Sequence, residues 1–244
     1  MKRDTKFYAM LQHSSDLQHS ARYAKGYRHQ DDLSKDEVSH AGKCEIIKKL
    51  TGGYQYPAVI LDLGCGTGRY FHCMKNIKLL IGVDPSDNML RMAKNPVGCA
   101  TSGAQLVQAS LHTIEFKPAT FDIVICVGVF GGVCPLDKFS LSQIARFLKP
   151  NGIFFFTIPE YLPTSKTWKT RMAELIQPFL FGHARRYVKL RLRRFSLSAS
   201  QVKRLISTSY CDPEIDRWES PTGRIDLHCI VKKKSTAYSS NIDR

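Results

Sequence analysis

The chain has 244 residues, of which 43% are hydrophobic, and a formal net charge of +15. The length suffices for one α/β domain with a buried core, and the apolar content is typical of a soluble protein. The longest apolar stretch, 123–136, is interrupted by glycines and a proline and is too short to cross a bilayer, which argues against a membrane protein. The N-terminus has no apolar signal core, so we expect a soluble, cytoplasmic protein.

The first predicted elements are helical. Residues 1–33 are polar with scattered aromatic side chains, which indicates a loosely helical arm or lid. Ser34 to Glu37 form a capping box, and the helix that it opens is expected to end near Leu50, before two glycines.

A strand with a glycine-rich loop follows at residues 58–68. The apolar run ends in Asp62, and the glycines at 64, 66 and 68 alternate after it. A loop without Cβ atoms lets backbone N–H groups approach a ligand closely. A helix is expected over 67–76, with its N-terminus facing the same ligand. The glycine spacing does not fit a dinucleotide fingerprint, and no Lys-Ser or Lys-Thr pair makes a P-loop. Asp62 instead suits a ligand that carries an ammonium group.

The next strand, 79–84, ends in Asp84, twenty residues after the first glycine. A carboxylate at the tip of the neighbouring strand can accept hydrogen bonds from both ribose hydroxyls. Further strands are expected at 104–109, 121–127 and 152–158, and helices at 86–94 and 138–148. A last helix from about residue 195 and an antiparallel strand pair at 212–218 and 226–233 complete the pattern. The alternation predicts a mostly parallel sheet with helices on both faces.

These motifs resemble those of the class I S-adenosylmethionine-dependent methyltransferases. The stretch from Asp62 to Gly68 is similar to their motif I, Asp/Glu-x-Gly-x-Gly-x-Gly, and Asp84 to Leu90 is similar to their second strand end and helix start. The resemblance covers residues 36–159 closely and 195–234 loosely. It implies a Rossmann-like, seven-stranded, mostly parallel sheet with helices on both faces, and S-adenosylmethionine as the cofactor.

The resemblance also implies a set of cofactor-binding residues. The glycine loop would lie under the methionine and ribose parts, Asp84 would hold the ribose, and Pro85 would line the adenine. Ser110 stands where the family commonly has an acid for the adenine amino group, so Ser110 or the Leu111 backbone would replace that acid. The full set is Asp62, Gly64, Cys65, Gly66, Thr67, Gly68, Asp84, Pro85, Ser110, Leu111, Cys126, Val127 and Gly128.

No side chain stands out as a catalytic base. His72 and His112 lie on predicted cofactor-side elements, but an isolated histidine is more often structural. Tyr161 follows the fifth strand and is the one substrate-binding candidate, with an ordinary loop residue as the alternative. The single domain then divides into the 1–33 arm, a 34–159 cofactor core, a 160–194 substrate-cover insertion and a 195–234 C-terminal part.

Eight cysteines are scattered along the chain without a Cys-x-x-Cys pair. We therefore expect free, reduced thiols and no metal site.

The favoured function is methylation of an oxygen or nitrogen of a small molecule, with secondary metabolism as the suggested setting. The stretch after the fourth strand, Cys-Val-Gly-Val-Phe-Gly-Gly, lacks the Asn/Asp-Pro-Pro-Tyr/Phe motif of enzymes that methylate planar amino groups of bases or glutamine. An RNA methyltransferase resembling those of tRNA wobble uridines is the alternative, because of the charge and the basic segment 183–194. A non-catalytic S-adenosylmethionine-binding partner protein is the third hypothesis.

Overall fold

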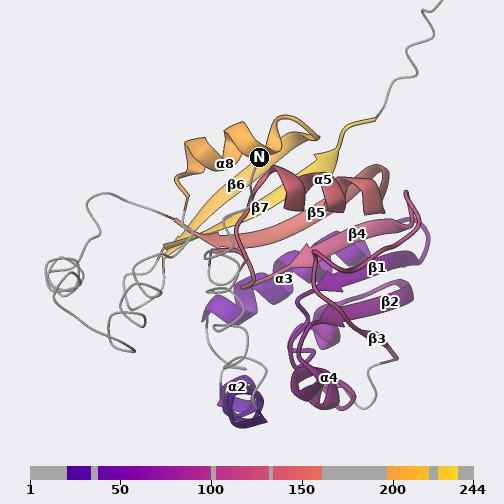
Figure 1. Ribbon diagram of the computed structural model, residues 1–244, viewed down its shortest axis with the longest axis vertical. Coiled ribbons are helices and arrows are strands. Elements are labelled where there is room, and N and C mark those ends of the chain that lie inside the picture. The colour runs from indigo at the N-terminus through magenta and orange to yellow at the C-terminus, as the bar shows by residue number, and fades with distance from the viewer. Residues whose placement is uncertain are drawn as a thin grey trace, which may run out of the picture.

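Seven strands form one sheet in the order β3-β2-β1-β4-β5-β7-β6 (Figure 1). The computed structural model describes residues 21–33, 38–99, 103–131, 134–160, 197–219 and 225–235. Neighbours among β1 to β5 pair in parallel, whereas β7 runs antiparallel to both β5 and β6. The predicted Rossmann-like sheet is therefore confirmed. The strands are β1 (Ala58–Leu63), β2 (Ile77–Asp84), β3 (Gln105–Gln108), β4 (Phe121–Cys126), β5 (Leu148–Pro159), β6 (Tyr210–Glu219) and β7 (Ile225–Lys233).

Helices flank the sheet, and three of them begin at capping side chains. Ser86, Asp137 and Ser198 each accept a hydrogen bond from a backbone N–H of the first helical turn. Among the described residues, no helix combines the length and apolar character needed to span a membrane. The helices among the described residues are α2 (Ala21–Leu33), α3 (Val38–Gly52), α4 (Asp87–Ala93), α5 (Lys138–Phe147) and α8 (Ala199–Ile206), together with the 3-10 turn η2 (Phe71–Cys73).

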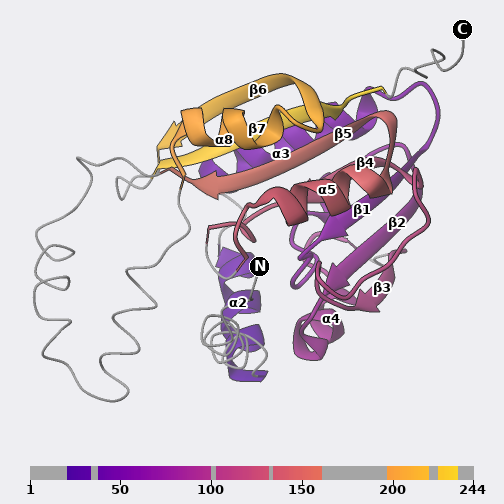
Figure 2. The ribbon, with the colours of Figure 1, turned by 45° about the horizontal axis from the view of Figure 1, so that its top comes forward.

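Helices lie on both faces of the sheet (Figure 2), and each face has its own hydrophobic core. Alternate residues of a strand point to opposite faces, so Phe154 and Phe156 join one core and Phe155 joins the other. The first core packs α5 and α8 onto the sheet, through residues such as Ile144 and Val202. The second packs α3, η2 and α4, through residues such as Ile47.

The predicted helix over 67–76 is wrong. Gly68 has a left-handed backbone (φ 76°), which an α-helix cannot contain, and only the 3-10 turn η2 follows it. Met74 is already extended, and β2 begins at Ile77. The crossover from β1 to β2 is thus too short for a full helix, and no helix N-terminus faces the glycine loop from within it. The expected capping box at 34–37 lies outside the described residues, and the helix after it ends at Gly52 instead of Leu50.

Candidate functional site

The carboxyl ends of the central strands meet at one edge of the sheet. The parallel register places Asp62 of β1 opposite Gly82 of β2 and Ile125 of β4. The loops after these three strands therefore begin side by side. Open α/β sheets bind ligands at this edge, where the strand order reverses on either side of β1.

The glycine loop after β1 is folded tightly onto the end of β2. The N–H groups of Gly64 and Cys65 both donate to the Val83 carbonyl, at 2.7 and 2.9 Å. The glycines at 64, 66 and 68 all have positive φ angles, of 78°, 54° and 76°. A Cβ built on Gly66 would meet no atom within 4 Å, so the backbone there borders open space that a ligand can enter.

Asp84 is fixed at the tip of β2 by backbone donors. Its Oδ2 accepts from the Gly66 N–H at 3.0 Å, and its Oδ1 accepts from the Ser86 N–H at 2.9 Å. The carboxylate is therefore oriented against the glycine loop. A carboxylate has about four lone-pair positions, which leaves acceptor capacity for further donors such as ribose hydroxyls.

Asp62 is a buried carboxyl group beside this second carboxylate. Its side chain is only 3% exposed, and burial, followed by the charge of Asp84, raises its pKa to about 7. Two carboxyl groups in one partly desolvated site favour a cationic ligand, because a nearby positive charge stabilises the ionised form of both. The ammonium group expected from the sequence fits this electrostatic environment.

Residues after β3 form a further wall. The Ala109 N–H donates to the Asp84 carbonyl at 3.2 Å, which brings this loop to the carboxylate. Ser110 begins a turn in which its hydroxyl lies 3.1 Å from the Thr113 hydroxyl. Leu111 has its side chain in the hydrophobic core, so its backbone is the part that can face a ligand. The exposed Pro85 lies between these segments, with its carbonyl accepting from Gln108 at 3.2 Å.

The loop after β4 closes the opposite side. Gly128 has a left-handed backbone (φ 75°), and its N–H donates to the buried Thr157 hydroxyl of β5 at 2.9 Å. A Cβ built on Gly128 would meet nothing within 4 Å, so this loop also borders open space. Val129 packs directly against Gly64, which joins this loop to the glycine loop. Thr157 was missed by sequence analysis, because a threonine inside an apolar strand carries no motif.

The two cysteines of the predicted site contribute packing. Cys65 and Cys126 are buried, at 7% and 0% exposure, and burial raises the pKa of both thiols. Neutral, buried thiols are poor nucleophiles. The Cys65 backbone is already paired, its N–H with the Val83 carbonyl and its carbonyl with the Gly68 N–H. Thr67 is fully buried, and the side chains of Cys65 and Cys126 belong to the two cores.

Helix α2 covers the glycine loop, and the sequence pattern did not specify this contact. Arg28 donates to the carbonyls of Thr67 at 3.5 Å and Met92 at 3.4 Å, and also to that of Asn95. The Arg69 guanidinium lies over the Tyr27 ring, with its central carbon 5.0 Å from the ring centroid. Burial, then Tyr27 and Asp84, raise the pKa of the Tyr23 hydroxyl. Figure 2 shows α2 beside α4 at this end of the sheet.

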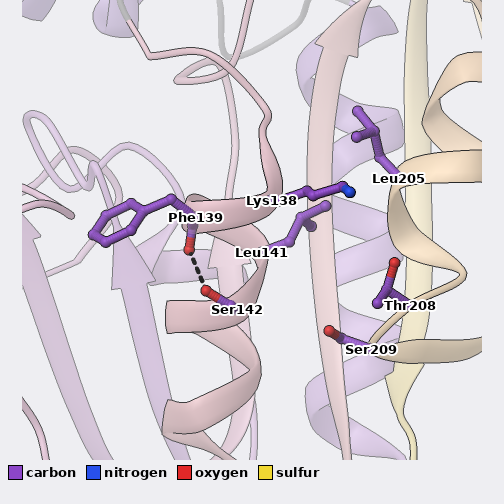
Figure 3. Close-up of a pocket in the computed structure, with 7 residues that line it drawn as sticks. All are labelled: Lys138, Phe139, Leu141, Ser142, Leu205, Thr208 and Ser209. Carbon is purple, nitrogen blue, oxygen red and sulfur yellow. Dashed lines mark hydrogen bonds between the residues drawn. The ribbon is translucent and has the colours of Figure 1, made fainter. Parts of the chain in front are cut away.

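The remaining candidates lie elsewhere. Tyr161, the insertion after Glu160 and the basic segment 183–194 are outside the described residues. His112 is exposed and stacks on Phe139 at 5.4 Å. A hollow of about 400 Å³ between α5 and the end of α8 includes Phe139 in its lining but none of the predicted site residues (Figure 3).

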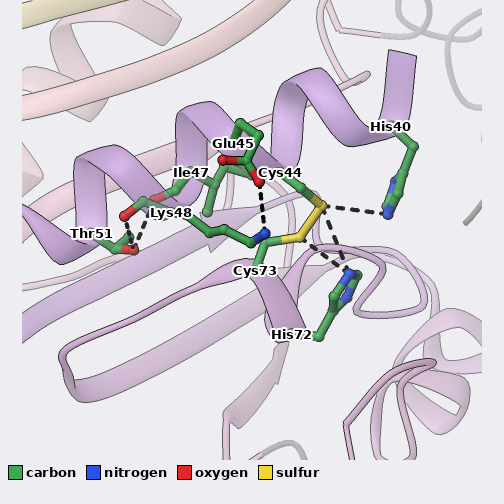
Figure 4. Close-up of a disulfide and its surroundings, with 8 residues drawn as sticks. All are labelled: His40, Cys44, Glu45, Ile47, Lys48, Thr51, His72 and Cys73. Carbon is green, nitrogen blue, oxygen red and sulfur yellow. Dashed lines mark hydrogen bonds and ion pairs between the residues drawn. A yellow bond between two sulfur atoms is a disulfide. The ribbon is translucent and has the colours of Figure 1, made fainter. Parts of the chain in front are cut away.

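The expectation of eight free thiols is wrong for one pair. Cys44 of α3 and Cys73 of η2 form a disulfide, with His40 and His72 beside it (Figure 4). The two cysteines are 29 residues apart in sequence, and their pairing depends on how α3 packs against η2, so no local spacing reveals it. The other six cysteines are free, as expected: Cys65, Cys99, Cys126, Cys134, Cys211 and Cys229.

The chain is similar in sequence to known methyltransferases. Residues 61–156, from the end of β1 to β5, match the methyltransferase domain family. An uncharacterized protein of Methanocaldococcus jannaschii is 33% identical over 137 residues, which are 55% of this chain and 48% of that protein. The malonyl-[acyl-carrier protein] O-methyltransferase of Halalkalibacterium halodurans is 33% identical over 109 residues, 41% of this chain and 39% of that protein. The chain thus spans about half or less of the length of these curated relatives.

A solved structure shares the fold over most of the chain. It is the 1,6-didemethyltoxoflavin-N1-methyltransferase of Burkholderia thailandensis, with 1,6-didemethyltoxoflavin and S-adenosylhomocysteine bound. The two chains superpose with a TM-score of 0.64 and 18% identity, covering 96% of this chain and 92% of the other. At this identity the likeness establishes the fold alone.

Proposed function

The chain belongs to the class I S-adenosylmethionine-dependent methyltransferases, and from this premise we propose that it methylates an oxygen or nitrogen of a small molecule. The observation that carries the proposal is the joint geometry of the glycine loop and Asp84. The loop presents a backbone without Cβ atoms, and the carboxylate is held against it through the Gly66 N–H at 3.0 Å. This is the arrangement that a ribose next to a cationic amino acid requires.

The residues present fit the cofactor. Gly66 and Gly128 border the open space, since a Cβ at either position would meet nothing within 4 Å. The Asp84 carboxylate would accept hydrogen bonds from the two ribose hydroxyls of the cofactor. The Asp62 carboxylate would stabilise the ammonium group of the cofactor electrostatically. Pro85 and the turn at Ser110 flank the adenine. S-adenosylmethionine supplies a methyl group that its sulfonium already activates, so the protein contributes mainly proximity and orientation.

A small acceptor is favoured by the compact domain and by the Burkholderia enzyme, whose structure holds 1,6-didemethyltoxoflavin. The Halalkalibacterium enzyme instead acts on a malonyl group carried by a protein. We further propose that residues 160–194, inserted between β5 and α8, contribute to the substrate cover and that Tyr161 lines it. Secondary metabolism is the proposed setting.

A methyl-transfer screen tests the proposal. The purified chain is incubated with methyl-labelled S-adenosylmethionine and either a panel of small hydroxyl and amine compounds or bulk tRNA. We expect label in small molecules and none in tRNA, and RNA binding that disappears at physiological salt. Transfer to tRNA would contradict the proposal and support the RNA alternative. Tight cofactor binding without transfer to either set would support the non-catalytic alternative.

Cofactor binding is expected to depend on the protonation of Asp62. Its pKa is raised to about 7, so the ligand-free protein holds a proton there at lower pH, and the ammonium group favours its release. Affinity for S-adenosylmethionine should therefore rise by up to about tenfold per unit between about pH 5 and pH 7. Titration calorimetry across this range measures the effect. Asp62→Asn should remove most of the dependence, whereas Asp87→Asn, an exposed acid paired with Arg91, should preserve it.

The same group gives a stability signature of opposite sign. Because the folded-state pKa lies above the ordinary value of 3.8, the folded protein binds the proton more tightly than the unfolded chain. The stabilisation is complete below about pH 4 and is lost as pH rises towards 7, by up to about 1.4 kcal/mol per unit for this residue. Urea unfolding of the ligand-free Asp62→Asn variant should lack this decline. An identical decline in both proteins would show that other groups cause it.

Helix α2 is proposed to act as a lid that tightens when cofactor binds. Arg28 donates to the Thr67 carbonyl of the glycine loop, and the Tyr27 ring lies 5.0 Å from the Arg69 guanidinium. Hydrogen exchange over Ala21–Leu33 should slow when S-adenosylhomocysteine is added. Arg28→Ala should weaken cofactor binding by about 1–2 kcal/mol and reduce the protection. Arg22→Ala, an exposed position on the same helix, is the control. Equal exchange with and without ligand would contradict the lid.

A further inference from the structure

Four metal-binding side chains converge behind the glycine loop, outside the proposed cofactor site. His40 and Cys44 come from α3, and His72 and Cys73 come from η2. One potential ligand atom of each lies within 4.8 Å of those of the other three. Figure 4 shows the two imidazoles directed at the two sulfur atoms. The cysteines and His40 are buried, and His72 is half-buried, so three of the four side chains are shielded from bulk solvent.

The nitrogen-to-sulfur distances already match those of a tetrahedral metal site. Cys44 Sγ lies 3.5 Å from His40 Nε2 and 3.8 Å from His72 Nε2. Cys73 Sγ lies 3.3 Å from His72 Nε2. A zinc ion with Zn–S bonds of about 2.3 Å and Zn–N bonds of about 2.0 Å requires N···S separations of about 3.6 Å. The same nitrogen, Nε2, faces the sulfurs in both histidines.

The fold presents these ligands on two packed elements. His40 and Cys44 are four residues apart, so they lie on one face of α3. His72 and Cys73 are adjacent in the turn that directly follows the glycine loop. The His40 ring stacks on Tyr70 at 5.2 Å and on His72 at 5.6 Å, which fixes the ring planes relative to η2. An ion bound here would fasten α3 to the turn that follows the glycine loop.

The structure shows the two cysteines joined in a disulfide. Thiolates, not disulfide sulfurs, bind metal ions, so the disulfide and a metal site are alternative states of one pair. In the disulfide state the two imidazole nitrogens lie within hydrogen-bonding distance of the sulfurs, and on reduction the same nitrogens can bind a metal ion together with the thiolates. A donor set of two sulfurs and two imidazole nitrogens is typical of structural zinc, and opening the disulfide lets the two sulfurs separate to the spacing that a tetrahedral ion requires.

We propose that, in the reduced protein, His40, Cys44, His72 and Cys73 bind one Zn²⁺ as a closed structural site. A phosphine reductant breaks the S–S bond, and its phosphorus takes the oxygen of one water molecule while the sulfurs take the two hydrogens. Zn²⁺ then displaces the two thiol protons and binds both thiolates and both Nε2 atoms. With four protein ligands the ion has no open position, so it acts on structure and takes no part in methyl transfer.

Metal content of the whole chain gives the first test. The protein is produced without a histidine tag, reduced with a phosphine, loaded with zinc, desalted and assayed by elemental mass spectrometry. We expect one zinc per chain. Loading with cobalt should give the intense visible absorption of tetrahedral Co²⁺ and a sulfur-to-cobalt charge-transfer band. X-ray absorption of the zinc form should show two sulfur and two nitrogen neighbours at about 2.3 and 2.0 Å.

Substitutions identify the ligands. Cys44→Ser and His72→Asn should each lower zinc affinity at least about a hundredfold, since loss of even an outer-shell partner costs tenfold or more. Cys99→Ser removes a free, half-buried thiol and should leave the affinity unchanged. Circular dichroism reports whether each variant folds. If a ligand variant does not fold, the wild-type X-ray absorption spectrum decides the ligand set by itself.

Three outcomes would overturn the proposal. The first is a fully reduced wild-type protein that binds neither zinc nor cobalt. The second is a metal spectrum with oxygen ligands or without sulfur. The third is a protein that is treated with phosphine while folded, then denatured, and in which a thiol reagent labels only the six free cysteines, because the Cys44–Cys73 pair would then be a permanent disulfide.

Discussion

Asp84→Ala is expected to weaken binding of S-adenosylmethionine by about 2–3 kcal/mol, or roughly 30- to 150-fold. The substitution removes a charged acceptor of two ribose hydroxyls. It also leaves the N–H groups of Gly66 and Ser86 without the carboxylate that orients this part of the loop, at 3.0 and 2.9 Å. Titration calorimetry of the folded variant measures the change.

Measuring two ligands separates the contribution of the ribose contacts to binding from that of the positive charge on the sulfonium. S-adenosylhomocysteine has the same ribose and lacks the sulfonium, so Asp84→Ala should weaken both ligands by a similar factor. Asp87→Ala, three residues along the chain and exposed, should leave both affinities unchanged. Unchanged affinity in Asp84→Ala would refute the assignment of the ribose site.

The sheet and the cofactor edge were largely predictable, because their signals are local. β1 has the predicted bounds, Ala58–Leu63, and β2 ends at Asp84 as predicted. A buried parallel strand appears in sequence as a continuous apolar run, and a carboxylate directly after such a run must lie at the sheet edge. The bond between Gly66 and Asp84 brings together two motifs that were identified separately.

Failures of prediction occurred where long-range packing determines the structure. The left-handed Gly68 ends the turn that was expected to begin a helix, and a glycine alone does not reveal its φ angle in sequence. The Cys44–Cys73 contact depends on the packing of α3 against η2. Arg28 contacts the glycine loop from 39 residues away, and no periodic pattern encodes such a contact.

Two alanine substitutions in the glycine loop are expected to separate folding from cofactor binding. At Gly64 a methyl group would collide with Val129, and the backbone is left-handed (φ 78°). Backbone strain of about 1–2 kcal/mol and overpacking of about 1–3 kcal/mol should add to a destabilisation of about 2–5 kcal/mol. Urea unfolding measures this change, and adding Val129→Ala should recover the overpacking part but not the backbone part.

Gly66→Ala is the matched substitution in the same loop. Its backbone is also left-handed (φ 54°), but a Cβ there would meet nothing within 4 Å, so the loss of stability should be only about 1–2 kcal/mol. The new methyl group would instead occupy the open space beside the Asp84 carboxylate, where we propose that the cofactor lies against the backbone of the glycine loop. We expect S-adenosylmethionine affinity to fall at least about tenfold in a protein that still unfolds cooperatively. Normal affinity in Gly66→Ala would mean that the cofactor does not lie against this loop, because only a ligand in that space would collide with the added methyl group.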